Sequence, residues 1–519
     1  MIKKIYFIVI AGLLTACSLD EEPKDQIPEE EAYTTPMTLY QNTVATLYNY
    51  IGGATDGEGL QGTCRGVYDL QTFGSDEAML PTRGIDWYDG GLWQDMYRHS
   101  WSAGHDLPKN AWIYLYKVIT LCNRSLEKLT EHKTLAGTHY NEWTSEVRAL
   151  RAIYYWYLID LFGDVPLVES TEVAMNKVTR EKRSKVFHFI ENELIQSMPY
   201  LSSENSVNEG DYYGRITGPV CYFVLAKLMI NSSVYLGTSD VYEYYEKCIE
   251  YCEQLEDLGY KLSTEYYENF LVYNEHSKEN IFVIPMDKNL YVNQQQNLYR
   301  SYHYRHAAAY GFTGENGSCA TLKTLEVFHY GKEDEDPRFI ENYWAGPVYD
   351  LGGRPVSDRT GNQLVYEPEK VEMNLSGSPY VETAGARMRK YEVDKNAPKD
   401  GKLMDNDIVL FRYADVLLMR AEALMRLDRT AEGQVFFNQV RQRVFADPRE
   451  LNEQNLLDER LLELCWEGWR RQDLIRFGQY KSLYTGPDAV DERDGHTTVY
   501  PIPADIRAMN ANLTQNTGY

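Results

Sequence analysis

One segment near the N-terminal end of the chain, residues 74–101, mixes aromatic rings with acidic and basic side chains. Aromatic rings stack on the apolar faces of sugar rings, and fixed carboxylates and guanidinium groups bond to hydroxyls. The segment lacks periodicity, and long loops of this kind in compact proteins are often functional. An exposed loop with this mix of groups could hold a ligand that has apolar faces and hydroxyls. The candidate residues are Asp76, Arg83, Asp86, Trp87 and Trp93.

Among these candidates, Asp76, Arg83 and Trp87 are the first choices. Trp87 stands between Asp86 and Tyr88, which favours exposure. Trp93 has an alternative interpretation that stays open, because a tryptophan at such a position can equally pack the loop onto the rest of the protein.

A second group of aromatic residues, in the C-terminal half, could complete the same site. Five tyrosines fall between residues 291 and 310, among asparagines and glutamines, and Tyr343 and Trp344 follow further on. Tyr310 and Trp344 stand close to glycines in segments without periodicity, which favours exposure, although either ring could instead anchor its loop. We add Tyr310 and Trp344 to the candidate ligand-binding residues.

Carboxylate pairs allow a second hypothesis, a glycoside hydrolase. Asp76 with Glu77, or Asp86 with Asp89, could form the two-carboxylate arrangement that glycoside hydrolysis needs. Acidic pairs are frequent by chance in so acidic a chain, however, and the motifs G-x-S-x-G, H-E-x-x-H and the P-loop are absent. We therefore predict a binding protein without catalytic residues.

The charge and the cysteine content of the chain limit the classes of partner, cofactor and metal that it can bind. The 519 residues carry a formal net charge of -25, which repels nucleic acid. The cysteines are too sparse for a disulfide scaffold and lack the spacing of a metal site. We expect no cofactor and no metal; Ca²⁺ is conceivable for so acidic a chain, but no segment has the sequence pattern of a calcium loop.

The N-terminus predicts export and a lipid anchor. Two lysines precede an apolar stretch that is too short to span a membrane, followed by Leu-Thr-Ala-Cys at residues 14–17. This ending resembles a bacterial lipobox, so residues 1–16 are predicted to be a signal peptide and Cys17 the site of lipid attachment. Residues 17–35 then form an acidic tether of flexible composition. Its first residues resemble the surface-export signal of lipoproteins in the Bacteroidetes.

Helices must position these candidate residues, because amphipathic periodicity dominates the rest of the chain. The predicted fold is mainly α, a scaffold of tetratricopeptide-like helical hairpins over residues 36–260 and 407–519, with a loop-rich insertion and a few short strands over 261–406. Both parts form one predicted domain, 36–519. The predicted helices cover residues 112–129, 143–161, 182–198, 217–236, 241–258, 407–427, 430–444 and 456–475.

Four blocks of this sequence carry a family resemblance. They are ALRAIYYWYLIDLFGDVPLV (149–168), RYADVLLMRAEALMRL (412–427) with NQVR (438–441), ERLLELCWEGWRRQDLIRFG (459–478), and the ending that runs from YPIP (500–503) to QNTGY (515–519). These blocks resemble signatures of the SusD/RagB family. The resemblance implies a glycan-binding lipoprotein of the outer membrane, anchored through Cys17 and facing the cell exterior. It also implies a SusC-like TonB-dependent transporter as partner, to which the protein delivers oligosaccharides, and no catalysis. Peptides or other nutrients remain alternative ligands.

The charged residues inside these blocks have a structural interpretation. Residues such as Arg412, Arg441 and Glu459 interrupt apolar helix faces, which is typical of ion pairs that fix how one helix lies against the next. Trp466 and Trp469 lie in the same blocks and are predicted to be core residues.

Overall fold

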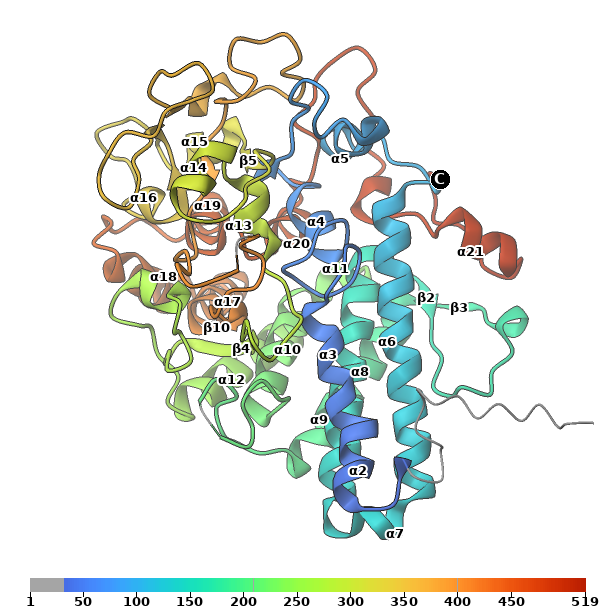
Figure 1. Ribbon diagram of the computed structural model, residues 1–519. Helices are drawn as coiled ribbons and strands as arrows, with labels where there is room; N and C mark the ends of the chain where they lie inside the picture. Colours follow the sequence, from blue (N-terminus) through green and yellow to red (C-terminus); the bar gives the residue numbers. More distant parts are fainter. Residues whose placement is uncertain (1–31, 209, 399) are drawn as a thin grey trace, which may run out of the picture.

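The computed structural model describes residues 32–208, 210–398 and 400–519 (Figure 1). The predicted signal peptide, Cys17 and most of the predicted tether lie outside these residues. The described chain is mainly α-helical, and its strands are short and occur in pairs, which confirms the predicted fold class. No helix of the described chain is long and apolar enough to cross a membrane.

The scaffold consists of helices that pack against their neighbours in the chain as antiparallel hairpins. α6 packs on α8, α8 on α9, α10 on α12, and α17 on α18, while α12 also contacts α17 and joins the two halves of the scaffold. The predicted helices overlap all of these, with ends that differ by up to six residues. Their bounds are α6 (Asp106–Glu131), α8 (Tyr140–Phe162), α9 (Arg183–Ser197), α10 (Gly218–Ile230), α12 (Tyr242–Asp257), α17 (Tyr413–Arg426) and α18 (Thr430–Arg443).

Shorter helices complete the two parts of the molecule. Those of the N-terminal and C-terminal parts are α2 (Pro36–Tyr40), α3 (Thr46–Gly52), α4 (Val67–Thr72), α5 (Leu92–Arg98), α7 (Lys133–Ala136), α11 (Ser232–Leu236), α19 (Glu453–Leu464), α20 (Arg470–Arg476) and α21 (Ala504–Met509). Those of the loop-rich part are α13 (Gln296–Ser301), α14 (Tyr304–Ala309), α15 (Leu322–Val327) and α16 (Phe339–Asn342). In Figure 1 the loop-rich part lies at one end of the molecule, beside α4 and α5.

All strand pairs are antiparallel. The longest, β4 (Asn280–Ile284) with β10 (Ile408–Arg412), joins the loop-rich part to the start of α17. The remaining pairs are β1 (Ala78–Met79) with β5 (Cys319–Ala320), β2 (Val165–Pro166) with β3 (Arg180–Glu181), β6 (Tyr343–Trp344) with β9 (Arg387–Met388), and β7 (Gly346–Pro347) with β8 (Val365–Tyr366).

Three predicted helices are wrong in part. The predicted helix 217–236 is interrupted at Asn231, between α10 and α11. Residues 408–412 form strand β10 rather than the first turns of α17, because this buried apolar run pairs with β4. The predicted helix 456–475 is broken into α19 and α20, because Cys465 is extended and Trp466 adopts a positive φ of 64°. The break lets the Trp466 side chain turn into the core, where it is 1% exposed.

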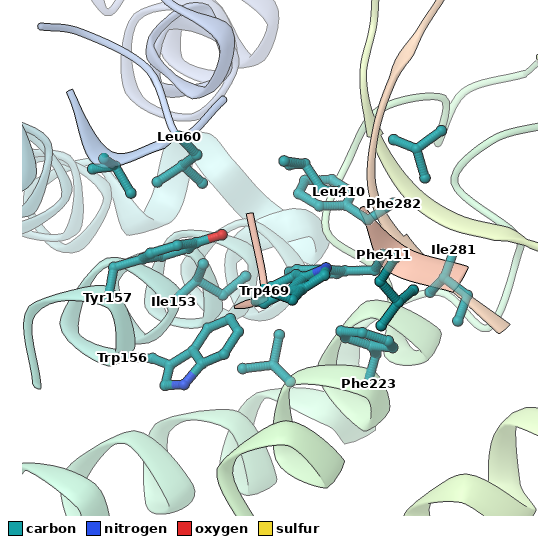
Figure 2. Packing of buried hydrophobic residues seen from close by; sticks show 14 of the residues in the cluster. Leu60, Ile153, Trp156, Tyr157, Phe223, Ile281, Phe282, Leu410, Phe411 and Trp469 are labelled. Carbon is teal, nitrogen blue, oxygen red and sulfur yellow. The ribbon is translucent and has the colours of Figure 1, made fainter. Parts of the chain in front are cut away.

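Aromatic side chains join the helices and the strands in one core (Figure 2). Phe223 of α10 stacks on Phe411 of β10 with ring centroids 4.4 Å apart, and Trp156 of α8 stacks on Trp469 at 5.9 Å. Such contacts add to the apolar area that the rings bury. The structure therefore confirms that Trp466 and Trp469 are core residues.

Buried ion pairs bind the C-terminal helices together, as the charged positions on the apolar helix faces predicted. The Arg412 side chain is fully buried, with Nη1 2.8 Å from Glu279 and Nε 2.8 Å from Glu467. Arg338 lies 2.6 Å from Glu459, which also pairs with Arg441. These charges fix helix register and are closed to ligands.

Candidate functional site

A pocket of about 440 Å³ opens where three distant segments meet, with Lys402 from a fourth, a volume within the usual range for small-ligand sites. The first segment precedes α4, the second is the loop before α5, and the third runs through α13 and α14 of the loop-rich part. The residues that line the pocket are Asp56, Cys64, Arg65, Ile85, Asp86, Trp87, Asp89, Gln296, Tyr304, Glu315 and Lys402.

Trp87 provides an aromatic surface in this pocket and is held on two sides. Its indole N–H donates a hydrogen bond to the Glu315 carbonyl at 3.0 Å. Its ring meets Trp93 edge to face, with centroids 6.3 Å apart. The ring also lies so close to Gly317 that a Cβ there would stand 2.7 Å from Trp87 Cε2. The half-buried indole is therefore a fixed platform.

Backbone geometry concentrates unusual conformations around the pocket. Arg65, Trp87 and Asp89 have φ angles of 60°, 61° and 43°, which lie in the left-handed region that residues other than glycine seldom adopt. Strained backbone conformations cluster at functional sites, where contacts with the surrounding structure hold them in place. Three of them at one pocket support a functional role for it.

Arg65 ties two loops of the pocket together. Its guanidinium lies 3.1 Å from Asp56 and 2.6 Å from Asp89, and Asp89 also accepts the indole N–H of Trp93 at 2.9 Å. Burial opposes the charge of Arg65, but Asp89 and Asp56 outweigh it and raise its pKa. Arg65 therefore stays charged and holds Asp89 in the pocket lining.

Asp86 and Tyr304 also line the pocket and bond to each other. The Tyr304 hydroxyl donates to Asp86 at 2.7 Å, and burial together with Asp86 raises the pKa of Tyr304 to about 12. Nearby, burial raises the pKa of Glu315, and the Lys402 ammonium lies 4.6 Å from the Tyr299 ring centroid. Carboxylates, a phenol and an ammonium thus surround the indole of Trp87, which is a set of groups that suits a ligand rich in hydroxyls.

The structure brings two of the predicted residues, Asp86 and Trp87, to this pocket and places three others beneath the surface. Asp76 is buried, and its carboxylate pairs with Arg470 at 2.6 Å. Arg83 is buried and donates to the carbonyls of Val381 at 3.0 Å and Ala384 at 2.8 Å. These partners correct the expectation that Asp76 and Arg83 are exposed on the loop. Trp93 is 1% exposed, so the packing alternative holds for it.

Tyr310 and Trp344 lie in a different cluster and do not line the pocket. Both are half-buried, with ring centroids 6.1 Å apart. The Trp344 indole donates to the Tyr302 hydroxyl at 2.7 Å, and the Arg389 guanidinium lies over the Trp344 ring at 4.4 Å. These contacts make both rings part of the packing of the loop-rich part.

Most of the remaining pocket residues were not predicted from the sequence. Arg65 and Asp56 belong to a glycine-rich, aperiodic stretch, and that composition was the available signal. Tyr304 belongs to the tyrosine-rich segment that was predicted to complete the site, and it does reach the pocket. Nothing in the sequence marks Lys402.

The carboxylate pairs considered for hydrolysis differ in access. Glu77 is buried beside Asp76 and accepts the backbone N–H of Trp466, so this pair cannot reach a substrate. Asp86 and Asp89 do line the pocket, with Asp89 held by Arg65. Within the described residues no group of three or more His, Cys, Asp or Glu side chains could hold a metal ion.

Two regions of the chain match models of known protein families. Residues 278–519 match a family model described as the SusD family, and residues 26–230 match one described as "Starch-binding associating with outer membrane". The two matches together cover most of the chain. The chain belongs to the SusD family. The pocket lies at the junction of the two matched regions, because Arg65 and Trp87 come from one and Tyr304 from the other.

Two relatives extend the SusD-family match over nearly the whole chain. The starch-binding protein SusD of Bacteroides thetaiotaomicron is 28% identical, over 90% of this chain and 89% of the relative. A SusD-like protein of Bacteroides ovatus is 23% identical, over 92% of this chain and 83% of the relative.

Solved structures of the SusD superfamily share the fold. A SusD superfamily protein from Bacteroides vulgatus aligns with a TM-score of 0.73 and 19% identity, over 94% of this chain and 100% of the other. Surface glycan-binding protein A from Bacteroides thetaiotaomicron, in complex with laminarihexaose, aligns with a TM-score of 0.71 and 18% identity, over 93% and 100%. The arrangement of scaffold and loop-rich part is therefore that of the SusD family.

Proposed function

We propose that this protein is a glycan-binding lipoprotein of the outer membrane, and that the pocket around Trp87 holds the glycan. The observation that carries the proposal is the fixed, half-buried indole of Trp87, surrounded by Asp86, Asp89 and Tyr304. A ring of this kind stacks on a sugar, and the polar groups bond to its hydroxyls. Starch binding and laminarihexaose binding in two similar proteins support a saccharide as the ligand.

The wider role that we propose is capture at the cell surface. The predicted anchor at Cys17 would hold the protein on the outer membrane, facing the exterior, where it would deliver oligosaccharides or polysaccharides to a SusC-like TonB-dependent transporter. The lipobox-like sequence and membership of the SusD family support this role. Its test is co-purification of a barrel protein with the full lipidated chain from outer membranes, and loss of the anchor in a Cys17→Ala variant.

Affinity electrophoresis tests the binding role directly. The soluble chain, begun after Cys17, is run through gels that each contain one polysaccharide, and the gels are assayed for released reducing sugar. We expect retardation by at least one glycan without sugar release. Trp87→Ala should weaken that retention by about 2 kcal/mol, or roughly thirtyfold, because a central tryptophan commonly dominates a binding site. Tyr88→Ala removes the neighbouring exposed ring, which does not line the pocket, and should leave retention unchanged.

Each other outcome selects a different function. Sugar release that is lost on Asp86→Asn would establish the hydrolase alternative and replace the binding role. Retention that survives Trp87→Ala in a folded variant would place the glycan elsewhere on the molecule. Absence of retention by every glycan would contradict the proposal and favour a peptide or another nutrient as the ligand.

A further inference from the structure

Carboxylates outnumber cations among the residues that line the Trp87 pocket. Asp56, Asp86, Asp89 and Glu315 line it together with two basic residues, Arg65 and Lys402. The potential inside a pocket depends on such an imbalance, because the protein walls screen charge less than water does. The excess of carboxylates over cations in the lining therefore affects which charge a bound sugar can carry.

Arg65 is already paired with two aspartates of the protein. Its Nη1 bonds to Asp56 and its Nη2 to Asp89, so its charge is balanced within the protein. Its backbone N–H donates to Asp69 at 2.6 Å, and Asp69 is itself held by the buried Arg300. Asp56 and Asp89 therefore already offset the charge that this guanidinium brings to the pocket.

Lys402 does not restore the balance. It is one cation, and it faces both the Tyr299 ring and the Glu315 carboxylate. Burial raises the pKa of Glu315, yet even a protonated Glu315 would leave three aspartates against two cations. The Asp86 carboxylate forms no ion pair within the described chain and accepts the hydroxyl of Tyr304.

Arg359, beside the pocket residue Tyr304, adds no unpaired positive charge. Arg359 lies 4.7 Å from the Tyr304 ring centroid but pairs with Glu382 at 3.1 Å. The chain as a whole carries a formal net charge of -25, so the longer-range field also opposes an anion.

We infer that the Trp87 pocket selects uncharged sugar units and rejects units that carry a carboxylate or a sulfate. Hydroxyls of a neutral sugar donate to Asp86 and Asp89, whereas an acidic group would meet a lining in which carboxylates outnumber cations. Like charges brought together at a binding site oppose association strongly. This inference rests on the proposed function, and it narrows the ligand to neutral glycans.

A matched pair of ligands tests the inference. The soluble chain is titrated with a neutral glycan that retards it and with the same glycan after partial carboxymethylation, at low and at moderate salt. We expect at least tenfold weaker affinity for the carboxymethylated form, and a smaller difference at higher salt because screening weakens the repulsion. Asp86→Lys should reduce the difference by raising affinity for the acidic form. Glu333→Gln, an exposed acidic position outside the pocket lining, should not.

The outcomes separate this inference from the proposed function. Equal or tighter binding of the acidic glycan, abolished by Trp87→Ala, would overturn the inference and leave glycan binding in place. A difference that Asp86→Lys does not reduce would also overturn it, because the selectivity would then have a source outside the pocket. Binding of no saccharide of either kind would overturn both.

Discussion

Arginine–carboxylate pairs occur in two regions of this molecule, with opposite relations to solvent. In the scaffold, the side chains of Arg412 and its partner Glu279 are fully buried. In the pocket, Arg65 is 32% exposed, and its partners Asp56 and Asp89 are 45% and 35% exposed. Removing one member of a buried pair leaves an uncompensated charge, whereas an exposed pair contributes little to stability. The same chemistry therefore specifies the fold in one region and remains open to a ligand in the other.

Tryptophans repeat this contrast. Trp466 and Trp469 are 1% and 3% exposed and join helices to strands, whereas Trp87 is half-buried and presents part of its ring to the pocket. A substitution in the scaffold should therefore change stability first, and one in the pocket should change binding first. Three predictions test this separation.

Arg412→Ala should have the largest effect. It removes the cation that contacts all three of Glu279, Glu463 and Glu467, and breaking a buried pair costs about 3–5 kcal/mol. Arg443, Arg338 and Lys390 still pair with these glutamates, which places the expected loss at the lower end. Urea denaturation followed by circular dichroism measures the loss. If the alanine variant does not fold, Arg412→Lys provides a milder test, because lysine keeps the charge but loses the planar fork.

Arg429 supplies the control for this prediction. It pairs with Glu432 at the surface, and both side chains are well exposed. Arg429→Ala should leave the denaturation midpoint unchanged. Equal midpoints for the variants at 412 and 429 would contradict the distinction between scaffold and surface charges.

Glu77→Gln should have an intermediate effect that depends on pH. Glu77 belongs to the segment 74–101 and is buried where this segment meets Trp466 of the scaffold. Burial raises the pKa of Glu77 from 4.5 to about 7. Between these values the folded chain binds more protons than the unfolded chain, so the contribution of Glu77 to stability falls as pH rises. Above pH 7 the full cost is present, at most about 3 kcal/mol. The glutamine variant should therefore be more stable than the wild type at pH 8, and its advantage should disappear near pH 4.5.

Thermal denaturation between pH 4.5 and 8 measures this difference. Glu326→Gln changes an exposed carboxylate and should track the wild type at every pH. A Glu77→Gln variant that is less stable at pH 8 would show that the carboxylate is stabilised in place, and that the boundary between site and scaffold tolerates a buried charge.

The scaffold could be predicted from the sequence more fully than the pocket, and the reason is physical. α8 and α17 follow from an apolar period along one stretch of chain, and buried charges on such helices must find partners. Strand β10 was missed because its apolar run continues into the apolar face of α17, and short runs of this kind do not distinguish strand from helix.

The pocket depends on contacts between distant segments. Asp86 and Trp87 could be predicted because local composition favours exposure, but Tyr304 lies 218 residues beyond Asp86 in the chain. The burial of Asp76 could not be predicted either, because its partner Arg470 is 394 residues away. Composition identifies a loop, whereas tertiary packing decides which of its side chains reach the surface.

Gly317→Ala should have the smallest effect and tests the pocket alone. Gly317 lies against the Trp87 ring, and an added Cβ would stand 2.7 Å from Cε2 and 2.9 Å from Nε1. The ring must move and lose its hydrogen bond to the Glu315 carbonyl, worth about 1 kcal/mol. We expect affinity for the glycan to fall about fivefold, a change of roughly 1 kcal/mol, with the denaturation midpoint nearly unchanged. Gly104→Ala, where the nearest atom to the added Cβ would be 3.7 Å away, is the control for binding and stability. Unchanged affinity in a variant whose tryptophan fluorescence has shifted would show that the ligand does not depend on the position of this ring.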